Sequence, residues 1–94
     1  MVDFHNTPEY RIWHEAVLEV DNHKCIVCGS DDRVQTHHIN SGTHYPDLRW
    51  EVWNGAVLCY NHHLKIHSDA GGYQIPTTNL DLLRLIAEEY HSVS

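Results

Sequence analysis

Two pairs of metal-binding side chains constrain this chain more than any other feature of its sequence. Cys25 and Cys28 form a Cys-x2-Cys pair, followed by Gly29, which allows a tight turn. Cys59 and His62 form a Cys-x2-His pair further along the chain. Structural zinc takes four such ligands in tetrahedral geometry, commonly two from each of two short loops. We therefore predict one structural zinc site with three thiolates and one imidazole.

The chain is short enough to need stabilisation beyond its hydrophobic core, and a structural zinc ion would provide it. Ninety-four residues make one small domain, 1–94, whose hydrophobic core alone is close to the limit of stability. Zinc binding would add folding free energy directly. Three cysteines cannot close a paired disulfide framework. The other interpretation, a redox Cys-x2-Cys pair with one spare thiol, needs a thioredoxin-like βαβ context that the sequence does not show.

Composition narrows the classes of function. No apolar run approaches the roughly 20 residues of a membrane span, and the N-terminus lacks the pattern of a signal peptide, so we expect a cytoplasmic protein without membrane contact. The net charge of −7 disfavours a nucleic-acid binder. The acidic excess lies in the flanks, however, because segment 24–67 holds four Lys or Arg and four Asp or Glu residues. That segment also holds all three cysteines and six of the ten histidines.

Local patterns predict a helix at each end of the chain. Thr7-Pro8 is typical of a helix start, with a capping hydroxyl before proline at the first helical position. Helical spacing then predicts an amphipathic helix over about 8–21, with an apolar face of Ile12, Trp13, Ala16, Val17 and Val20. A last helix over about 79–90 is expected to begin near Thr78 and to pack through Leu80, Leu83, Ile86 and Ala87.

The middle of the chain reads as two strands and a helix. β-branched residues over 33–39 predict a first strand, and a polar loop over 40–51 follows. A second short strand over 56–58 comes after the turn signal Asn54-Gly55. A helix over about 60–68 ends before Gly71-Gly72. The sequence therefore predicts an α+β domain.

Several histidines remain after the zinc site is filled. His63 and His67 are four residues apart on the predicted helix and share a face that differs from the face of Cys59 and His62. This separation favours two metal sites. His37 and His38 are adjacent on a strand, so their side chains point to opposite faces. Neutral imidazole is both a common metal ligand and the natural general base near pH 7. We expect the remaining histidines of the flanks to be surface residues: His5, His14, His23 and His91.

The ordered motifs of the middle segment resemble a known family. They are Cys25-Ile-Val-Cys28-Gly29, Thr36-His37-His38-Ile39, Tyr45-Pro46-Asp47-Leu48-Arg49, Asn54-Gly55-Ala56-Val57-Leu58-Cys59, His62-His63 and His67. Together they resemble the HNH endonuclease family, and most of all its small zinc-containing members from bacteriophages and mobile elements. The resemblance covers residues 25–67. It implies a ββα-metal (His-Me finger) core at 24–68, stapled by the structural zinc and flanked by N- and C-terminal helices.

The resemblance also implies roles for individual residues. His38 would be the general base that takes a proton from the attacking water, and Asn54 would hold its imidazole in orientation. His63 would ligate the catalytic divalent ion, with His37 and His67 as further ligands. An all-histidine ligand set favours Mn²⁺, Ni²⁺, Co²⁺ or Zn²⁺ over Mg²⁺.

The implied function is a metal-dependent DNA endonuclease or nickase. It would hydrolyse phosphodiester bonds by a single-metal, histidine general-base mechanism, leaving 5′-phosphate and 3′-OH ends. A phage-encoded enzyme of this kind would act in the host cell cytoplasm, with DNA and packaging proteins such as terminase as partners. The alternative is a zinc-stapled interaction module with weak or lost catalysis that acts with a packaging or repair protein.

The sequence departs from the family pattern at positions that bear on zinc and DNA binding. His62 stands where most relatives have cysteine, and because His63 is its neighbour the two assignments could exchange. Asn40 and Val20 stand where relatives often have Lys and Arg, which predicts weak and salt-sensitive DNA binding.

Few residues of the middle segment are suited to contact DNA. Arg49 is the leading candidate for a phosphate or minor-groove contact, and its alternative is a salt bridge to Glu51. Lys65 points away from the His63 and His67 face and is expected to be solvated. The aromatic side chains are expected to pack rather than to stack on bases: Tyr45, Trp50 and Trp53.

Overall fold

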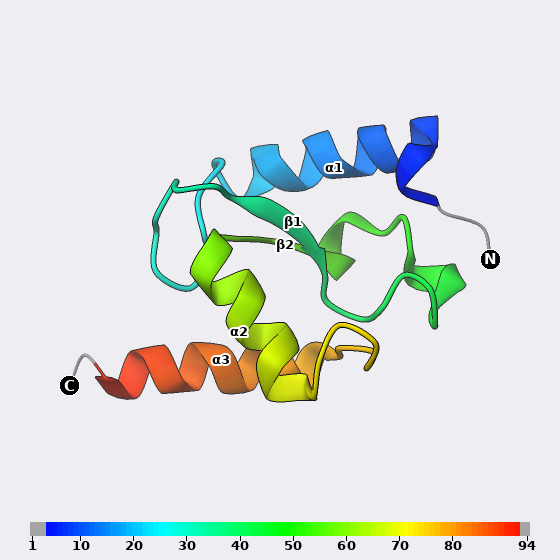
Figure 1. Ribbon diagram of the computed structural model, residues 1–94. Helices are drawn as coiled ribbons and strands as arrows, with labels where there is room; N and C mark the ends of the chain where they lie inside the picture. Colours follow the sequence, from blue (N-terminus) through cyan, green and yellow to red (C-terminus); the bar gives the residue numbers. More distant parts are fainter. Residues whose placement is uncertain (1–3, 93–94) are drawn as a thin grey trace.

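The chain is a small α+β domain built on a two-stranded antiparallel sheet. The computed structural model describes residues 4–92, with side chains described as far as Tyr90. Helix α1 (Pro8–Val20) lies along one side of the sheet of β1 (Gln35–His38) and β2 (Gly55–Leu58), and helices α2 (Tyr60–Ala70) and α3 (Asn79–Ser92) lie on the other side (Figure 1). The remaining elements are the 3-10 turns η1 (Phe4–Asn6), η2 (Pro46–Leu48) and η3 (Val52–Asn54).

The two strands pair from Gln35 opposite Leu58 to His38 opposite Gly55. The predicted strand over 33–39 is shorter than expected because Arg33 has φ +45°, which extended backbone does not allow. Side chains alternate across β2, so Val57 packs toward α1 while Leu58 packs toward α2 and α3. The short sheet thus separates two small apolar clusters.

Helix α1 begins as the sequence predicts but buries a different face. The Thr7 hydroxyl accepts a hydrogen bond of 3.2 Å from the Tyr10 backbone N–H, which confirms the predicted cap. Trp13 and Val17 are buried as expected, whereas Ile12 is 70% and Val20 68% exposed. The Trp13 indole fixes the rotation of the helix, because its Nε1–H donates to the Glu51 carbonyl at 2.9 Å while its ring packs beside Val57 and Trp50.

Gly55 lies in a strand rather than in the predicted turn. Its backbone is extended (φ −116°) and it is the first residue of β2. A Cβ atom at this position would collide with the Val17 side chain and would lie 2.8 Å from Trp13 Cζ2. Gly55 therefore lies where α1 packs too closely against the sheet to admit a side chain.

Helix α3 also begins where predicted and also turns another face to the core. The Asp81 carboxylate accepts a hydrogen bond of 2.8 Å from the Thr78 backbone N–H, a first-turn acidic cap. Leu82 and Leu85 are buried, together with residues of β2 and α2 and with Cys25 and Cys59. The residues predicted to pack are exposed: Leu80, Leu83, Ile86 and Ala87.

Helix α2 runs to Ala70 and stops at Gly71, whose φ of +109° is a left-handed cap. None of the helices within residues 4–92 combines the length and the apolar character of a membrane span.

Candidate metal centres

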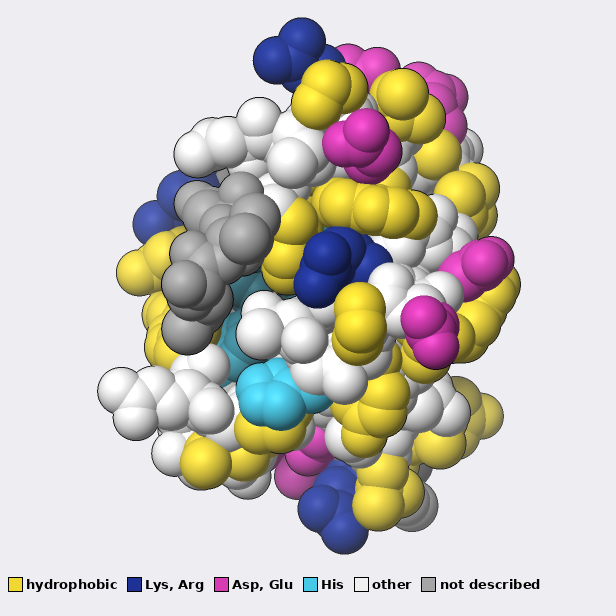
Figure 2. Space-filling view, turned by 90° about the vertical axis from the view of Figure 1, so that its right-hand side faces the viewer, with side chains coloured by type: hydrophobic (Ala, Val, Ile, Leu, Met, Phe, Trp, Pro, Cys, Tyr) yellow, Lys and Arg dark blue, Asp and Glu magenta, His cyan; other side chains and the backbone are white. Residues whose placement is uncertain are grey.

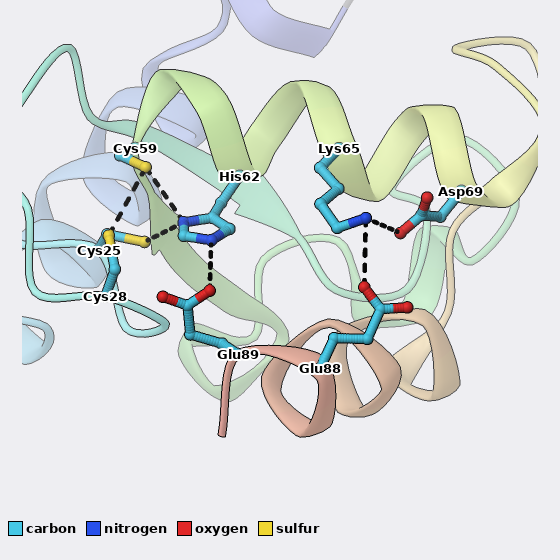
Figure 3. A network of polar contacts seen from close by, with 8 residues as sticks. All are labelled: Cys25, Cys28, Cys59, His62, Lys65, Asp69, Glu88 and Glu89. Carbon is cyan, nitrogen blue, oxygen red and sulfur yellow. Dashed lines mark hydrogen bonds and ion pairs between the residues drawn. The ribbon is translucent and has the colours of Figure 1, made fainter. Parts of the chain in front are cut away.

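The four predicted zinc ligands lie together where the sheet meets α2 (Figure 3). Cys28 Sγ is 3.8 Å from Cys59 Sγ, and Cys25 Sγ is 3.6 Å from His62 Nδ1. Zinc bonds of about 2.3 Å to sulfur and about 2.0 Å to nitrogen, at tetrahedral angles, place two sulfurs about 3.8 Å apart and a sulfur and a nitrogen about 3.5 Å apart. The Cys59 Sγ to His62 Nδ1 distance is shorter, at 3.2 Å. The donor set fits one tetrahedral metal ion.

Local backbone structure brings the two pairs together. The turn that carries Cys25 and Cys28 closes when the Gly29 backbone N–H donates to the Cys25 carbonyl at 2.8 Å, with Gly29 at φ +77°. Cys59 is the N-cap of α2, so His62 falls in the first helical turn beside it. The Ile26 backbone N–H donates to the Val57 carbonyl at 2.9 Å and ties the turn to β2. Two local motifs and one strand contact therefore suffice to assemble the cluster.

The thiol pKa values show why this cluster suits a cation. Burial raises the pKa of Cys25, but backbone hydrogen bonds at Cys59, Cys28 and Val27 lower it by more, so the pKa is about 7, below that of a free cysteine. Burial and the neighbouring thiols raise the pKa of Cys28 to about 11. A second thiolate is therefore disfavoured beside the first. The positive charge of a bound cation would offset this repulsion, so the coordinating thiols would be deprotonated.

A second cluster is formed by His37 from β1 and by His63 and His67 from α2. The Nε2 atoms of His63 and His67 are 3.2 Å apart, close to the roughly 3.3 Å expected for two nitrogens on one tetrahedral metal. The adjacent residues His62 and His63 thus fall into different clusters, with His62 among the cysteines.

This second cluster is built of neutral imidazoles. Burial lowers the pKa of His37 to about 3, with smaller contributions from the neighbouring histidines. Burial also lowers the pKa of His63 to about 4 and lowers the pKa of His67. His67 Nδ1 is buried without a hydrogen-bond partner within the described part of the chain. Neutral rings whose Nε2 atoms face each other suit a metal ion. The unpartnered Nδ1 of His67 is a different atom from the Nε2 that faces His63 and does not belong to this donor set.

Two residues of the α2–α3 connection support these histidines, and the sequence analysis missed both. The Thr77 hydroxyl, itself buried, lies 3.3 Å from His37 Nε2. The Tyr73 ring stacks on His67, with ring centroids 4.3 Å apart. Neither contact has a signal in the sequence, because each joins residues whose spacing follows no helix or strand period.

His38 lies in a fixed orientation beside the second cluster. Its Nε2–H donates to the Arg49 carbonyl at 2.9 Å, which leaves the Nδ1 lone pair available. Its ring is parallel to Trp13, with centroids 3.9 Å apart. Burial lowers the pKa of His38 to about 4, against a smaller opposing effect of the Arg49 carbonyl. The lowered pKa keeps this imidazole neutral near pH 7 and makes it a weaker base than a free histidine, and the hydrogen bond at Nε2 leaves Nδ1 as the atom that could accept a proton.

The resemblance implies that Asn54 orients the His38 imidazole, and the described contacts of its side chain are with the loop that carries Arg49. Asn54 is completely buried, and its side-chain Oδ1 accepts from the backbone N–H and side-chain amide of Asn40 at 2.9 and 3.0 Å. Its Nδ2 donates to the carbonyls of Asn40 and Leu48 at 3.0 and 3.2 Å. Asn54 therefore fixes both ends of the loop that carries Arg49, and it affects His38 through the Arg49 carbonyl.

Arg49 is half-buried and does not form the alternative salt bridge to Glu51 among the described residues. Its Nε–H donates to the Gly42 carbonyl at 2.9 Å, and its guanidinium lies 4.4 Å from the Phe4 ring centroid. Of the three aromatic residues expected to pack, Trp50 does so against the cluster that contains Trp13, whereas Trp53 is 59% exposed. Tyr45 is also exposed.

A groove of about 730 Å³ joins His38 to the second cluster. Figure 2 shows histidine side chains set partly below the surrounding surface. The described residues that line the groove include no Lys, Arg, Asp or Glu but include seven histidines: His5, His14, His37, His38, His44, His63 and His67. The acidic residues that the structure describes are therefore kept out of the groove.

One histidine that was expected at the surface lines the groove instead. His14 is half-buried, and its Nδ1 is hydrogen-bonded to the Thr36 hydroxyl at 2.7 Å. His5 and His23 are exposed as predicted. The side chain of His91 lies outside the described residues.

No protein-family model, curated protein or solved structure matches this chain.

Proposed function

We propose that this chain is a metal-dependent DNA endonuclease or nickase of the HNH type, with a ββα-metal core. The observation that carries the proposal is the groove shared by His38 and the His37, His63 and His67 cluster. A base with a free lone pair and a three-histidine metal site open to one groove are the groups that phosphodiester hydrolysis needs. The order β1, β2, α2, with these histidines on β1 and α2, supports the same core.

Different residues of the chain have different roles in the proposed hydrolysis. A divalent ion held by His37, His63 and His67 would supply Lewis acidity toward a phosphodiester oxygen when bound. His38 takes the proton of the attacking water at Nδ1, because its Nε2–H is committed to the Arg49 carbonyl. Asn54 holds the loop that presents this carbonyl. The expected products carry 5′-phosphate and 3′-OH ends.

The site of Cys25, Cys28, Cys59 and His62 is proposed to hold structural zinc. Its donor spacing matches tetrahedral zinc, and Cys25 and Cys59 share an apolar cluster with Leu58 and Ile66. Zinc there would tie the turn before β1 to the start of α2, which carries His63 and His67.

The charge distribution suggests how DNA would bind. The groove is free of acidic side chains among its described residues, and Arg49 at its edge, against Phe4 and Gly42, is the candidate phosphate contact. With a net charge of −7, unaided binding should be weak and salt-sensitive. We therefore expect a partner, such as a packaging protein of a phage, to bring the domain to DNA in the host cytoplasm.

The alternative is a metal-stapled interaction module that acts with a packaging or repair protein. It is favoured by exposed apolar side chains on two helices, among them Ile12 and Val20 of α1 and Leu80 and Leu83 of α3. Such surfaces often mark sites of protein contact.

A nicking assay separates the two functions. Supercoiled plasmid is incubated at low salt with Mn²⁺ or Ni²⁺ and with wild type, His38→Ala or the control His23→Ala, whose histidine pairs with Glu19 outside the groove. The nuclease proposal predicts nicking by wild type and His23→Ala and a loss of about 100-fold or more in His38→Ala. Equal inactivity of all three proteins with every divalent ion would favour the interaction module.

A further inference from the structure

The two ring nitrogens of His62 face different partners. Nδ1 is directed toward the thiols, 3.2 Å from Cys59 Sγ and 3.6 Å from Cys25 Sγ. Nε2 is directed the opposite way, 3.4 Å from Oε2 of Glu89 on α3 (Figure 3). One imidazole therefore connects the cysteine cluster to the last helix.

The carboxylate decides which nitrogen carries the proton. A neutral imidazole has one N–H and one lone pair, and an ionised carboxylate can only accept. The Nε2–H of His62 therefore donates to Glu89, and the lone pair of Nδ1 faces the cysteines. This is the tautomer that a metal ligand requires, and a carboxylate behind a ligating histidine both orients the ring and strengthens it as a donor.

The contact lies in a semi-enclosed position. The His62 side chain is 14% exposed and the Glu89 side chain 39%. On the same helix, Leu82 and Leu85 are buried in the cluster that includes Cys25 and Cys59. The packing of α3 and the orientation of His62 are thus held by the same small part of the core.

We propose that Glu89 is a positioning residue of the cysteine–histidine metal site, and that it couples metal binding to the docking of α3. This inference rests on the proposed zinc site and is independent of nuclease activity. Metal bound at Nδ1 makes the Nε2–H a stronger donor, so the contact with Glu89 strengthens when the site is loaded. In return, a docked α3 holds the His62 ring ready for the metal.

The neighbouring residue provides a matched control. Glu88 also joins α3 to α2, because its Oε2 lies 3.2 Å from Lys65 Nζ, and Lys65 also pairs with Asp69 at 3.2 Å (Figure 3). These three side chains are each about half exposed. Removing Glu88 therefore weakens a contact between the same two helices without touching His62.

The test compares the zinc affinities of wild type, Glu89→Ala, Glu89→Gln and Glu88→Ala by competition with a chromophoric chelator. We expect Glu89→Ala to bind zinc about 10–100-fold more weakly, because loss of a partner behind a ligating histidine has this effect. Glu89→Gln keeps a carbonyl acceptor and should recover part of the loss. Glu88→Ala should bind like wild type.

Two spectroscopic readouts separate positioning from general stability. Co²⁺ bound to wild type and to Glu88→Ala should give the same visible spectrum, whereas the spectrum of Glu89→Ala should shift because the ring is no longer held. Amide hydrogen exchange in α3 should slow on zinc addition in wild type and much less in Glu89→Ala.

The outcomes that overturn the inference are distinct. Equal zinc affinity of wild type and Glu89→Ala would contradict the role of Glu89, and so would an equal loss in Glu88→Ala and Glu89→Ala, which would indicate helix docking alone. Failure of wild type to bind zinc would overturn the metal site and this inference with it, yet would leave the nicking assay to decide the nuclease proposal.

Discussion

His62 and His63 are neighbours in the chain, yet they belong to different clusters of potential metal ligands. His62 lies with the three cysteines, and His63 lies with His37 and His67. Adjacent residues of an α-helix are separated by about 100° around its axis, so one turn of α2 can serve two sites. The helix therefore sets the position of the second cluster relative to the first.

The two clusters should differ in their effect on stability. Cys25→Ser removes a ligand of the proposed structural zinc and should lower the free energy of unfolding by about 3 kcal/mol or more, a fall in Tm of roughly 12–24 °C for a domain of this size. His63→Ala should retain a Tm near that of wild type, since it removes no ligand of that site. Thermal unfolding followed by circular dichroism, with zinc present, measures both.

A Cys25→Ser protein that melts at the temperature of wild type would contradict the structural role of the site. A large loss of thermal stability in His63→Ala alone would indicate that the His37, His63 and His67 cluster holds the structural metal.

Asn54 should matter for the loop rather than for the proton transfer itself. Asn54→Ala leaves the half-buried partners at Asn40 and Leu48 unsatisfied, and an unsatisfied group that is fully buried costs about 1–3 kcal/mol. We therefore expect a loss of stability together with faster amide exchange over residues 40–49. Hydrogen exchange of the Asn54→Ala protein measures this, and unchanged protection of the loop would contradict the assignment.

His38 should remain neutral well below pH 6. Its pKa is about 4 in the folded chain, against about 6.5 for an unfolded histidine. The unfolded chain therefore binds this proton more readily, so the stabilisation is complete above about pH 6.5 and is lost as the pH falls toward 4. Nitrogen-15 NMR of the imidazole should show an Nε2–H tautomer that is unchanged from pH 7 to pH 5.

The variant Trp13→Leu provides the comparison, because it removes the ring that stacks on His38. The pKa of His38 should rise toward its usual value in this variant. Titration of His38 between pH 6 and pH 7 in wild type would show that burial does not control it.

The sequence allowed much of the fold to be predicted because its strongest signals are local. The cap at Thr7, the stop at Gly71 and the spacing of Cys59, His62 and His63 each depend on a few neighbouring residues. Their grouping in space follows from the geometry of one helix and one turn.

The buried faces of the terminal helices could not be predicted in the same way. In α3 the exposed Leu83 and the buried Leu82 are both leucine, and only the partners Leu58 and Ile66 decide between them. Thr77 and Glu89 contact histidines of the two ligand clusters, and the sequence did not indicate them for a related reason. Each contacts its histidine over a separation of many residues, which no periodicity encodes.

The central claim is that this chain holds two separate metal sites, and metal stoichiometry tests it most directly. Native mass spectrometry of the chain loaded with Zn²⁺ or Co²⁺ should find two ions in wild type and one in His63→Ala. The remaining ion of His63→Ala should keep the thiolate-to-metal charge-transfer bands of a cysteine site when it is Co²⁺. A single ion in both proteins would contradict the claim.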